Sequence, residues 1–199
     1  MALIARIRRA ARIHSLAPGE LSLAMSLVGL DIVARVAPHA SNVTPIAASA
    51  LFAGMVLRSR ALAVAVPISA MLPSDLFVGA YDWRIMGVVS AALALPALLA
   101  RWGRAWRPAV VLAPLVLSSS LLFFATTNLA VWAFSGMYAH DLHGLVLCYV
   151  AALPFLYNTV GGDLLWTTLL FGTWWSAKFL LAPKVKFSMG GKPSLLPRS

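Results

Sequence analysis

The chain has 199 residues, of which 61% are hydrophobic and 11% are charged, and 16 Lys and Arg stand against 6 Asp and Glu. A chain this apolar leaves too little polar surface to face water, so the composition excludes an ordinary soluble domain. The single cysteine, Cys148, excludes an intrachain disulfide framework. The net charge of +10 does not indicate a nucleic-acid partner, because the basic residues lie in short segments between apolar runs, as they do in membrane proteins. We therefore expect an integral membrane protein in contact with the lipid bilayer.

A basic segment, residues 1–18, precedes the first apolar run, and such an arrangement also introduces signal peptides. This run contains Asp31 and Arg35, lacks a small-x-small cleavage site and is followed by further apolar runs. We therefore predict that the run is retained as a membrane helix. The segment before it is predicted to be a cytoplasmic leader that touches anionic lipid.

Six apolar runs follow one another along the chain and predict an all-α, polytopic membrane protein. Three of them are short against the ~20 residues that cross a bilayer, so we expect a compact bundle or a locally thinned membrane. The apolar run 144–156 is shorter still and contains Pro154, and we expect it to form a half-helix over the outer end of the bundle. The fold class is thus a compact bundle of six transmembrane helices, over residues 19–178, with a short half-helix in the last outer loop and a flexible basic tail, residues 179–199. The predicted spans are 19–36, 43–57, 61–78, 84–100, 109–134 and 158–178.

With six spans, fourteen of the sixteen basic residues fall on one side of the membrane. Only Arg35 and Arg84 fall on the other side. Lys and Arg are retained on the cytoplasmic side of a membrane, so both termini are predicted to be cytoplasmic. An odd number of spans would scatter the pattern. The fourteen residues are Arg6, Arg8, Arg9, Arg12, Arg58, Arg60, Arg101, Arg104, Arg107, Lys178, Lys184, Lys186, Lys192 and Arg198.

Most of the other amide and ionisable side chains fall in the outer half of this arrangement. A polar group inside hydrocarbon costs free energy unless something binds it, so such groups mark candidate functional sites. The asymmetry predicts a polar pocket that is open to the exterior and closed toward the cytoplasm. We expect six side chains to contact a small solute there: Asn42, Asp75, Asn128, Trp132, Asn158 and Asp163.

Each of these side chains also has a purely structural interpretation. Asp75 could cap a loop through backbone N–H groups, and Trp132 could belong to the aromatic belt at the membrane interface. Asn128 and Asn158 could tie the last two spans together by hydrogen bonds. Asp163 follows two glycines, where neighbouring backbone can approach closely, and could serve packing alone.

Two further patterns predict helix packing. Asp31 and Arg35 are four residues apart in the first span, so they can form a structural ion pair on one helix face. Ala47, Ala50 and Gly54 in the second span are small enough to allow close helix contact.

No motif predicts catalysis or a cofactor. The sequence contains no nucleophile elbow, no zinc-protease helix and no phosphate-binding loop, so we expect neither an enzyme nor a chain that energises transport with ATP by itself. His140 and His143 flank Asp141, and such side chains can ligate metals, but two histidines three residues apart in a loop are a weak signal. No metal site is predicted.

Four stretches carry a family resemblance: PHASNVTPIAASALFAG (38–54), PSDLFVG (73–79), SSLLFFATTNLAVW (119–132) and GLVLCYVAALPFLYNTVGGDLLWTTLLFG (144–172). They resemble an uncharacterised bacterial family of six-helix transport-type proteins, over about residues 30–175. That family in turn resembles the S components, which are the substrate-binding subunits of energy-coupling-factor vitamin transporters.

The resemblance implies an outward-facing pocket in a bacterial cytoplasmic membrane protein, built from the last three helices and the outer loops. It also implies docking on a membrane subunit that carries two ATPases. The alanine-x-x-x-alanine docking motif of S components is not present in the first span, where Ser22 and Ser26 stand at that spacing. The predicted function is therefore uptake of a vitamin-like micronutrient by a solute-binding membrane subunit. The alternative is a non-catalytic accessory or structural subunit of a larger membrane complex.

Overall fold

The computed structural model describes residues 18–79, 81–105 and 108–181, and within them the chain is all helical, without strands. Most of the predicted leader and residues 182–199 of the predicted tail lie outside the described residues. The helices in chain order are α2 (Pro18–Val36), α3 (Ile46–Val56), α4 (Arg60–Val78), α5 (Trp83–Gly103), α6 (Pro108–Phe134) and α7 (Leu142–Leu181).

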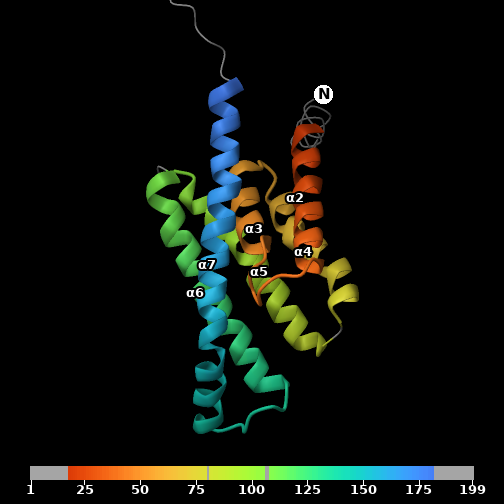
Figure 1. The fold of residues 1–199 in the computed structure, drawn as a ribbon, viewed down its shortest axis with the longest axis vertical. Coiled ribbons are helices and arrows are strands. Elements are labelled where there is room, and N and C mark those ends of the chain that lie inside the picture. The colour runs from red at the N-terminus through yellow and green to blue at the C-terminus, as the bar shows by residue number, and fades with distance from the viewer. Residues whose placement is uncertain (1–17, 80, 106–107, 182–199) are drawn as a thin grey trace, which may run out of the picture.

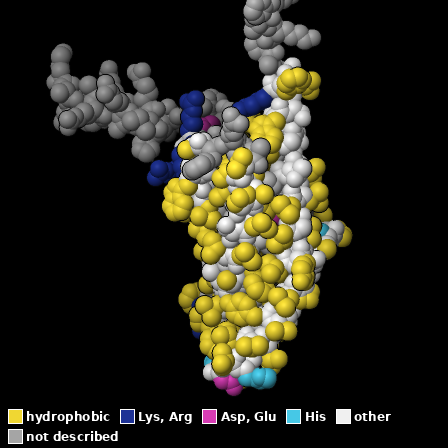
Figure 2. Space-filling model, turned by 90° about the vertical axis from the view of Figure 1, so that its left-hand side faces the viewer, with side chains coloured by type: hydrophobic (Ala, Val, Ile, Leu, Met, Phe, Trp, Pro, Cys, Tyr) yellow, Lys and Arg dark blue, Asp and Glu magenta, His cyan; other side chains and the backbone are white. Residues whose placement is uncertain are grey.

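Successive helices run in opposite directions along the long axis of the bundle (Figure 1). Both ends of the described chain lie at the upper end in this view, and the connection between α6 and α7 lies at the lower end. Lys and Arg side chains gather at the upper end, whereas Asp and His side chains mark the lower tip (Figure 2). The described part of the chain thus has the charge asymmetry that the sequence predicts.

Four helices are long and apolar enough to cross a membrane: α4, α5, α6 and α7. Together with the composition, they indicate a polytopic membrane protein. Helix α2 carries three charged residues, Glu20, Asp31 and Arg35. Helix α3 has 11 residues and is therefore about 16 Å long, against about 30 Å of hydrocarbon in a bilayer. The predicted second span is a half-length helix that cannot cross a bilayer by itself.

The prediction of a separate half-helix at residues 144–156 is wrong, because α7 is one continuous helix of 40 residues. Pro154 lies inside it. A proline removes one backbone hydrogen bond, but a long apolar helix packed on neighbours tolerates that loss. At 1.5 Å per residue α7 is about 60 Å long, more than the roughly 40–45 Å of a whole bilayer. It extends beyond the other helices at both ends (Figure 1).

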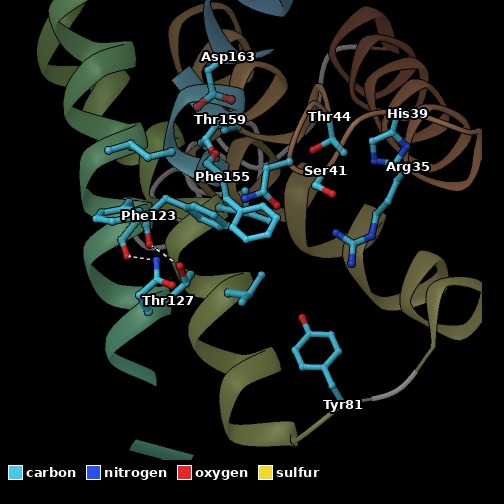
Figure 3. A pocket seen from close by; sticks show the side chains of 17 residues that line it. Arg35, His39, Ser41, Thr44, Tyr81, Phe123, Thr127, Phe155, Thr159 and Asp163 are labelled. Atoms are coloured by element: carbon cyan, nitrogen blue, oxygen red, sulfur yellow. Dashed lines mark hydrogen bonds between the residues drawn. The ribbon is translucent and has the colours of Figure 1, made fainter. Parts of the chain in front are cut away.

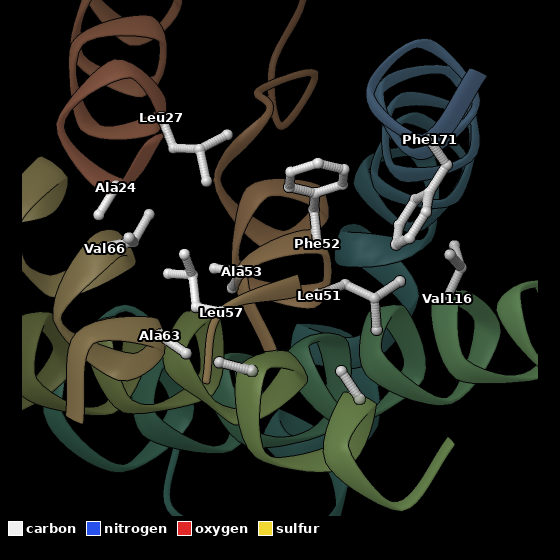
Figure 4. Packing of buried hydrophobic residues seen from close by; sticks show 13 residues of the cluster. Ala24, Leu27, Leu51, Phe52, Ala53, Leu57, Ala63, Val66, Val116 and Phe171 are labelled. Carbon is white, nitrogen blue, oxygen red and sulfur yellow. The ribbon is translucent and has the colours of Figure 1, made fainter. Parts of the chain in front are cut away.

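Helix α3 is the centre of the core (Figure 4). Eight of its 11 residues are buried, and it contacts α2, α4, α5, α6 and α7. The Phe52 ring packs edge-on against Phe171 of α7 at 5.0 Å between ring centroids. A Cβ atom at Gly54 would lie 2.3 Å from the carbonyl oxygen of Ala97, so only glycine allows α3 and α5 to come this close. The predicted use of small residues for packing is confirmed at this position.

Guanidinium groups bind the carbonyl end of α3. The last carbonyls of a helix have no partner within it and must be satisfied from outside. Arg104, directly after α5, donates to the carbonyl oxygens of Gly54, at 3.0 Å, and of Leu57. Arg101 donates to the carbonyl oxygen of Arg58 at 3.2 Å. Cations also interact favourably with the negative end of a helix dipole. This end of the half-length helix is therefore closed.

Candidate functional site

A cavity of about 540 Å³ opens beside the other end of α3. This volume falls within the ~300–1,000 Å³ of small-molecule sites in proteins. Its walls come from α2, the α2–α3 connection, α3, α5, α6, α7 and residue 81 (Figure 3), and we call it the polar cavity. It is lined by Arg35, His39, Ser41, Asn42, Thr44, Ala47, Tyr81, Val89, Leu93, Phe123, Phe124, Thr127, Asn128, Phe155, Leu156, Thr159 and Asp163.

The α2–α3 connection forms one wall because α7 carries a glycine opposite it. Asn42 has φ of 65°, a left-handed conformation that asparagine tolerates better than most residues. A Cβ atom at Gly162 would lie 3.0 Å from the Cα atom of Val43, whereas one at Gly161 would meet nothing within 4 Å. The close backbone approach that the sequence predicts here is confirmed for Gly162. It places Asn42 at the cavity.

Arg35 forms an ion pair across the bundle, and the predicted pair with Asp31 is wrong. The Arg35 guanidinium lies 2.5 Å from Oδ1 of Asp75 in α4, and the two side chains are 14% and 6% exposed. It also donates to the Met71 sulfur at 3.0 Å. Asp31 instead accepts a hydrogen bond of 2.7 Å from Ser49 of α3. Helical spacing allows an i,i+4 pair, but the packing of α2 against α4 offers Arg35 a more buried partner.

Asp163 of α7 is a buried carboxylate on the inner wall of the polar cavity. It is 5% exposed, and Oδ2 accepts a hydrogen bond of 2.7 Å from Ser120 of α6. On the side of Asp163 away from the polar cavity, a small void too narrow for water separates α7 from the first turn of α3. Ser119 and Thr167 also line this void. Among the described residues Asp163 has no cationic side chain within 4 Å, since the ion pairs there are Arg35–Asp75 and one at the rim.

The polar side chains of α6 and α7 present mainly acceptor oxygens to the cavity. The hydroxyls of Thr127 and Thr159 donate to helical carbonyls four residues earlier, at 2.7 and 2.8 Å. The amide nitrogen of Asn128 does the same at 2.8 Å. A threonine has one hydroxyl hydrogen, which is used here, whereas Asn128 keeps its oxygen and one N–H free. Ligand groups that donate hydrogen bonds are therefore better matched to this wall than acceptors are.

Aromatic rings form another part of the cavity wall. Phe123 and Phe155 face it from α6 and α7, and Tyr81 faces it from the α4–α5 connection (Figure 3). Partial burial, with the nearby Asp75 carboxylate adding to it, raises the pKa of the Tyr81 phenol above its ordinary value of 10.0. The phenol thus keeps its proton at neutral pH and can donate a hydrogen bond at the mouth of the cavity.

Residues 17–185 match the model of a protein family described as "Family of unknown function (DUF6580)". The chain belongs to this family. No curated protein and no solved structure matches it.

In this DUF6580 protein, three of the six predicted site residues line the polar cavity: Asn42, Asn128 and Asp163. Asp75 does not line it but holds the lining residue Arg35. Trp132 lies in the last turn of α6, and its ring nitrogen donates to the carbonyl of Ala139 in the α6–α7 connection at 2.9 Å. Asn158 is not among the lining residues.

Other lining residues of the DUF6580 chain carry weaker sequence signals. For Arg35 the sequence predicts a local pair, because spacing along one helix says nothing about partners on another helix. The rings of Phe123 and Phe155 sit in apolar runs that look the same whether they face lipid or a cavity. Tyr81 follows the predicted third span directly, and only the fold brings it opposite α7.

His140 and His143, the weak metal signal of the sequence, do not line the cavity. The His140 ring packs edge-on against Trp132 at 5.5 Å between centroids. Within the described ranges, no three or more His, Cys, Asp and Glu side chains are grouped so that they could hold a metal ion.

Proposed function

We propose that this protein is the solute-binding subunit of an uptake system for a vitamin-like micronutrient, with the polar cavity as its binding site. The observation that carries the proposal is the combination of a 540 Å³ cavity with a buried carboxylate, Asp163, and an ion-paired arginine, Arg35, on its walls. Ionisable groups at such depth in an apolar bundle are costly and mark solute pathways.

The proposal includes an orientation in the bacterial cytoplasmic membrane. Both termini and the arginines around α3 would face the cytoplasm, following the positive-inside rule. The cavity is bordered by residues of the α2–α3 and α4–α5 connections, which lie toward the opposite end of the bundle. It would therefore open to the exterior. All six helices would lie in the membrane, with α3 covered by the other five.

In the proposed cycle, a solute enters the polar cavity from outside and the outer connections close over it. A reorientation of the bundle then releases it inward. The sequence has no nucleotide-binding motif, so energy would come from a membrane partner with ATPases, as the likeness to S components implies. Ser22 and Ser26 are exposed on one face of α2, and small residues of this kind allow a partner helix to approach closely.

Two asparagines provide a matched test. Asn128 lines the cavity and Asn158 does not. Purified protein is expected to gain thermal stability with one compound of a vitamin panel, because a ligand that binds the folded state stabilises it. Asn128→Ala should weaken that binding about tenfold, the effect of losing a well-formed polar contact in a buried site, whereas Asn158→Ala should leave it unchanged.

Equal losses in both variants would place the site elsewhere. No response to the panel, together with stoichiometric co-purification of other membrane proteins, would favour an accessory subunit instead.

A further inference from the structure

We propose that the polar cavity selects a small organic cation, with an ammonium-type group held at Asp163 and an aromatic or aliphatic body against the phenyl rings. This inference names the substrate class of the site and rests on the proposed function.

The first argument is the charge of the cavity. Arg35 is neutralised by Asp75, at 2.5 Å, and His39 lies at the exposed mouth, where its Nδ1 is 2.7 Å from the carbonyl oxygen of Ala37. Asp163 remains as the charge that no described cationic side chain balances within 4 Å. Burying a carboxylate is costly unless it is paired or hydrogen-bonded, and one hydroxyl contact from Ser120 does not neutralise Asp163. Asp31 is likewise bonded only by a serine among the described residues, but it does not line the cavity, so of the two only Asp163 can meet a ligand there. A cationic ligand supplies the missing charge.

The helix dipole of α3 offsets part of the negative charge of Asp163. Its first turn lies next to Asp163 across the small void, so its partial positive charge favours the ionised carboxylate. A helix N-terminus carries only about half a unit of charge. This partial charge is smaller than the full charge of a cationic ligand, so it does not replace one.

The second argument is hydrogen-bond polarity. Thr159 lies one helical turn before Asp163 in α7, and its hydroxyl donates to its own helix and offers an oxygen to the cavity. An ammonium group has only donors, so it can bind the Thr159 oxygen together with the carboxylate. An anion at the same place would meet acceptors and a like charge.

The third argument is the size and material of the walls. A volume of 540 Å³ is far larger than a bare metal ion needs. Phe123, Phe124 and Phe155 line the cavity on the side of α6 and α7, which also carries Asp163 (Figure 3). The faces of aromatic rings attract cations, most strongly when water is excluded. The occupant is therefore an organic molecule with a positively charged group.

The experiment uses three probes with the same phenylalkyl body and different charge: 2-phenylethylammonium, 2-phenylethanol and 3-phenylpropanoate. Each is added at equal concentration to the detergent-purified full chain, and its apparent affinity is taken from the shift in the unfolding temperature. The ammonium is expected to bind about tenfold or more tightly than the alcohol, because hydrogen bonds to charged groups are the stronger class. The carboxylate probe is expected to give no shift.

Asp163→Asn should abolish the preference for the ammonium while keeping the shape of the site. Asp82→Asn removes the same charge from the rim, outside the cavity, and should leave the preference intact. Should Asp163→Asn not fold, Phe155→Leu provides a second readout. It keeps the apolar volume but removes a ring face, and the ammonium-to-alcohol ratio should fall about two- to fivefold.

Tightest binding by the alcohol or the carboxylate overturns the cation inference and leaves the proposed function standing. An ammonium preference that survives Asp163→Asn, or an unchanged ratio in Phe155→Leu, also overturns it. Absence of any shift, both with these probes and with the vitamin panel, overturns the inference and the proposed function together.

Discussion

The two ends of α3 have opposite surroundings: one is packed and hydrogen-bonded, and the other borders the polar cavity. At its carbonyl end, Arg101 and Arg104 donate to backbone oxygens, and Leu57 is fully buried. At its amino end, the hollow end, lies the polar cavity, where the carboxylate of Asp163 has a hydroxyl beside it but no cationic side chain within 4 Å among the described residues. The arginines at the carbonyl end have backbone carbonyl partners within the protein, whereas the carboxylate of Asp163 at the amino end can still pair with a ligand. This difference points to a binding site at the hollow end and to a structural role at the closed end.

The largest expected effect concerns the ion pair at the hollow end. Asp75→Asn leaves the Arg35 guanidinium buried without its counterion. Removing one partner of a buried pair typically costs about 3–5 kcal/mol, and the partial exposure of Arg35 to the cavity places the expected loss near the lower figure. Thermal unfolding should show a large drop. Combining Asp75→Asn with Arg35→Gln should restore part of the loss, and a double variant no better than Asp75→Asn would show that the pair is not the reason.

A smaller loss of stability is expected where the closed end packs. Gly54→Ala places a methyl group 2.3 Å from the carbonyl oxygen of Ala97, so α3 and α5 must move apart. Overpacking of this kind typically costs about 1–3 kcal/mol. Gly87→Ala is the control in α5, because a Cβ atom there meets nothing within 4 Å. Equal unfolding temperatures for the two variants would contradict the close packing of α3 on α5.

The third effect separates binding from stability at the hollow end. The leucine side chain of Gly162→Leu pushes Val43 and the neighbouring Asn42 away from α7, whereas that of Gly161→Leu extends into open space. We expect the first variant to lose solute binding several-fold with little change in unfolding temperature, since the α2–α3 connection can shift. The second should bind as the parent does. Ligand-induced thermal shifts measure both, and loss of binding in Gly161→Leu alone would contradict the geometry.

The smallest effect is expected at the rim. Hydrogen bonds from Arg84 lower the pKa of the exposed Asp82 carboxyl from 3.8 to about 2. Because the folded-state pKa is the lower one, this contribution is present above pH 3.8 and is lost as the pH falls toward 2. Asp82→Ala should therefore lower the unfolding temperature slightly at neutral pH and have no effect in strong acid. A difference that grows on acidification would contradict this sign.

Much of the fold could be predicted from the sequence, because the apolar runs, the polar segments between them and the positions of the arginines are local features. The helices and the sorting of charge between the two ends follow from them. The continuity of α7 could not be predicted, since whether Pro154 ends a helix depends on the neighbours that hold the chain on both sides of it. The failure of α3 to span likewise depends on its being enclosed by other helices.

The candidate site was predictable only in part, for a related reason. Asn42, Asn128 and Asp163 stand out because polar groups are rare in apolar helices, and all three line the cavity. The partner of Arg35 lies 40 residues away in the sequence, so it depends on the packing of α2 against α4. Asn158 carries the same signal as Asn128 but lies outside the lining, because composition does not say which side of a helix faces the cavity.

Mass spectrometry of the small molecules released from the intact, gently purified protein tests the central claim most directly. The account predicts one positively charged organic compound in near-stoichiometric amount, which is lost from Asp163→Asn and retained in Asp82→Asn. A cavity that releases no small molecule, while a second membrane protein accompanies the chain in fixed proportion, would contradict it.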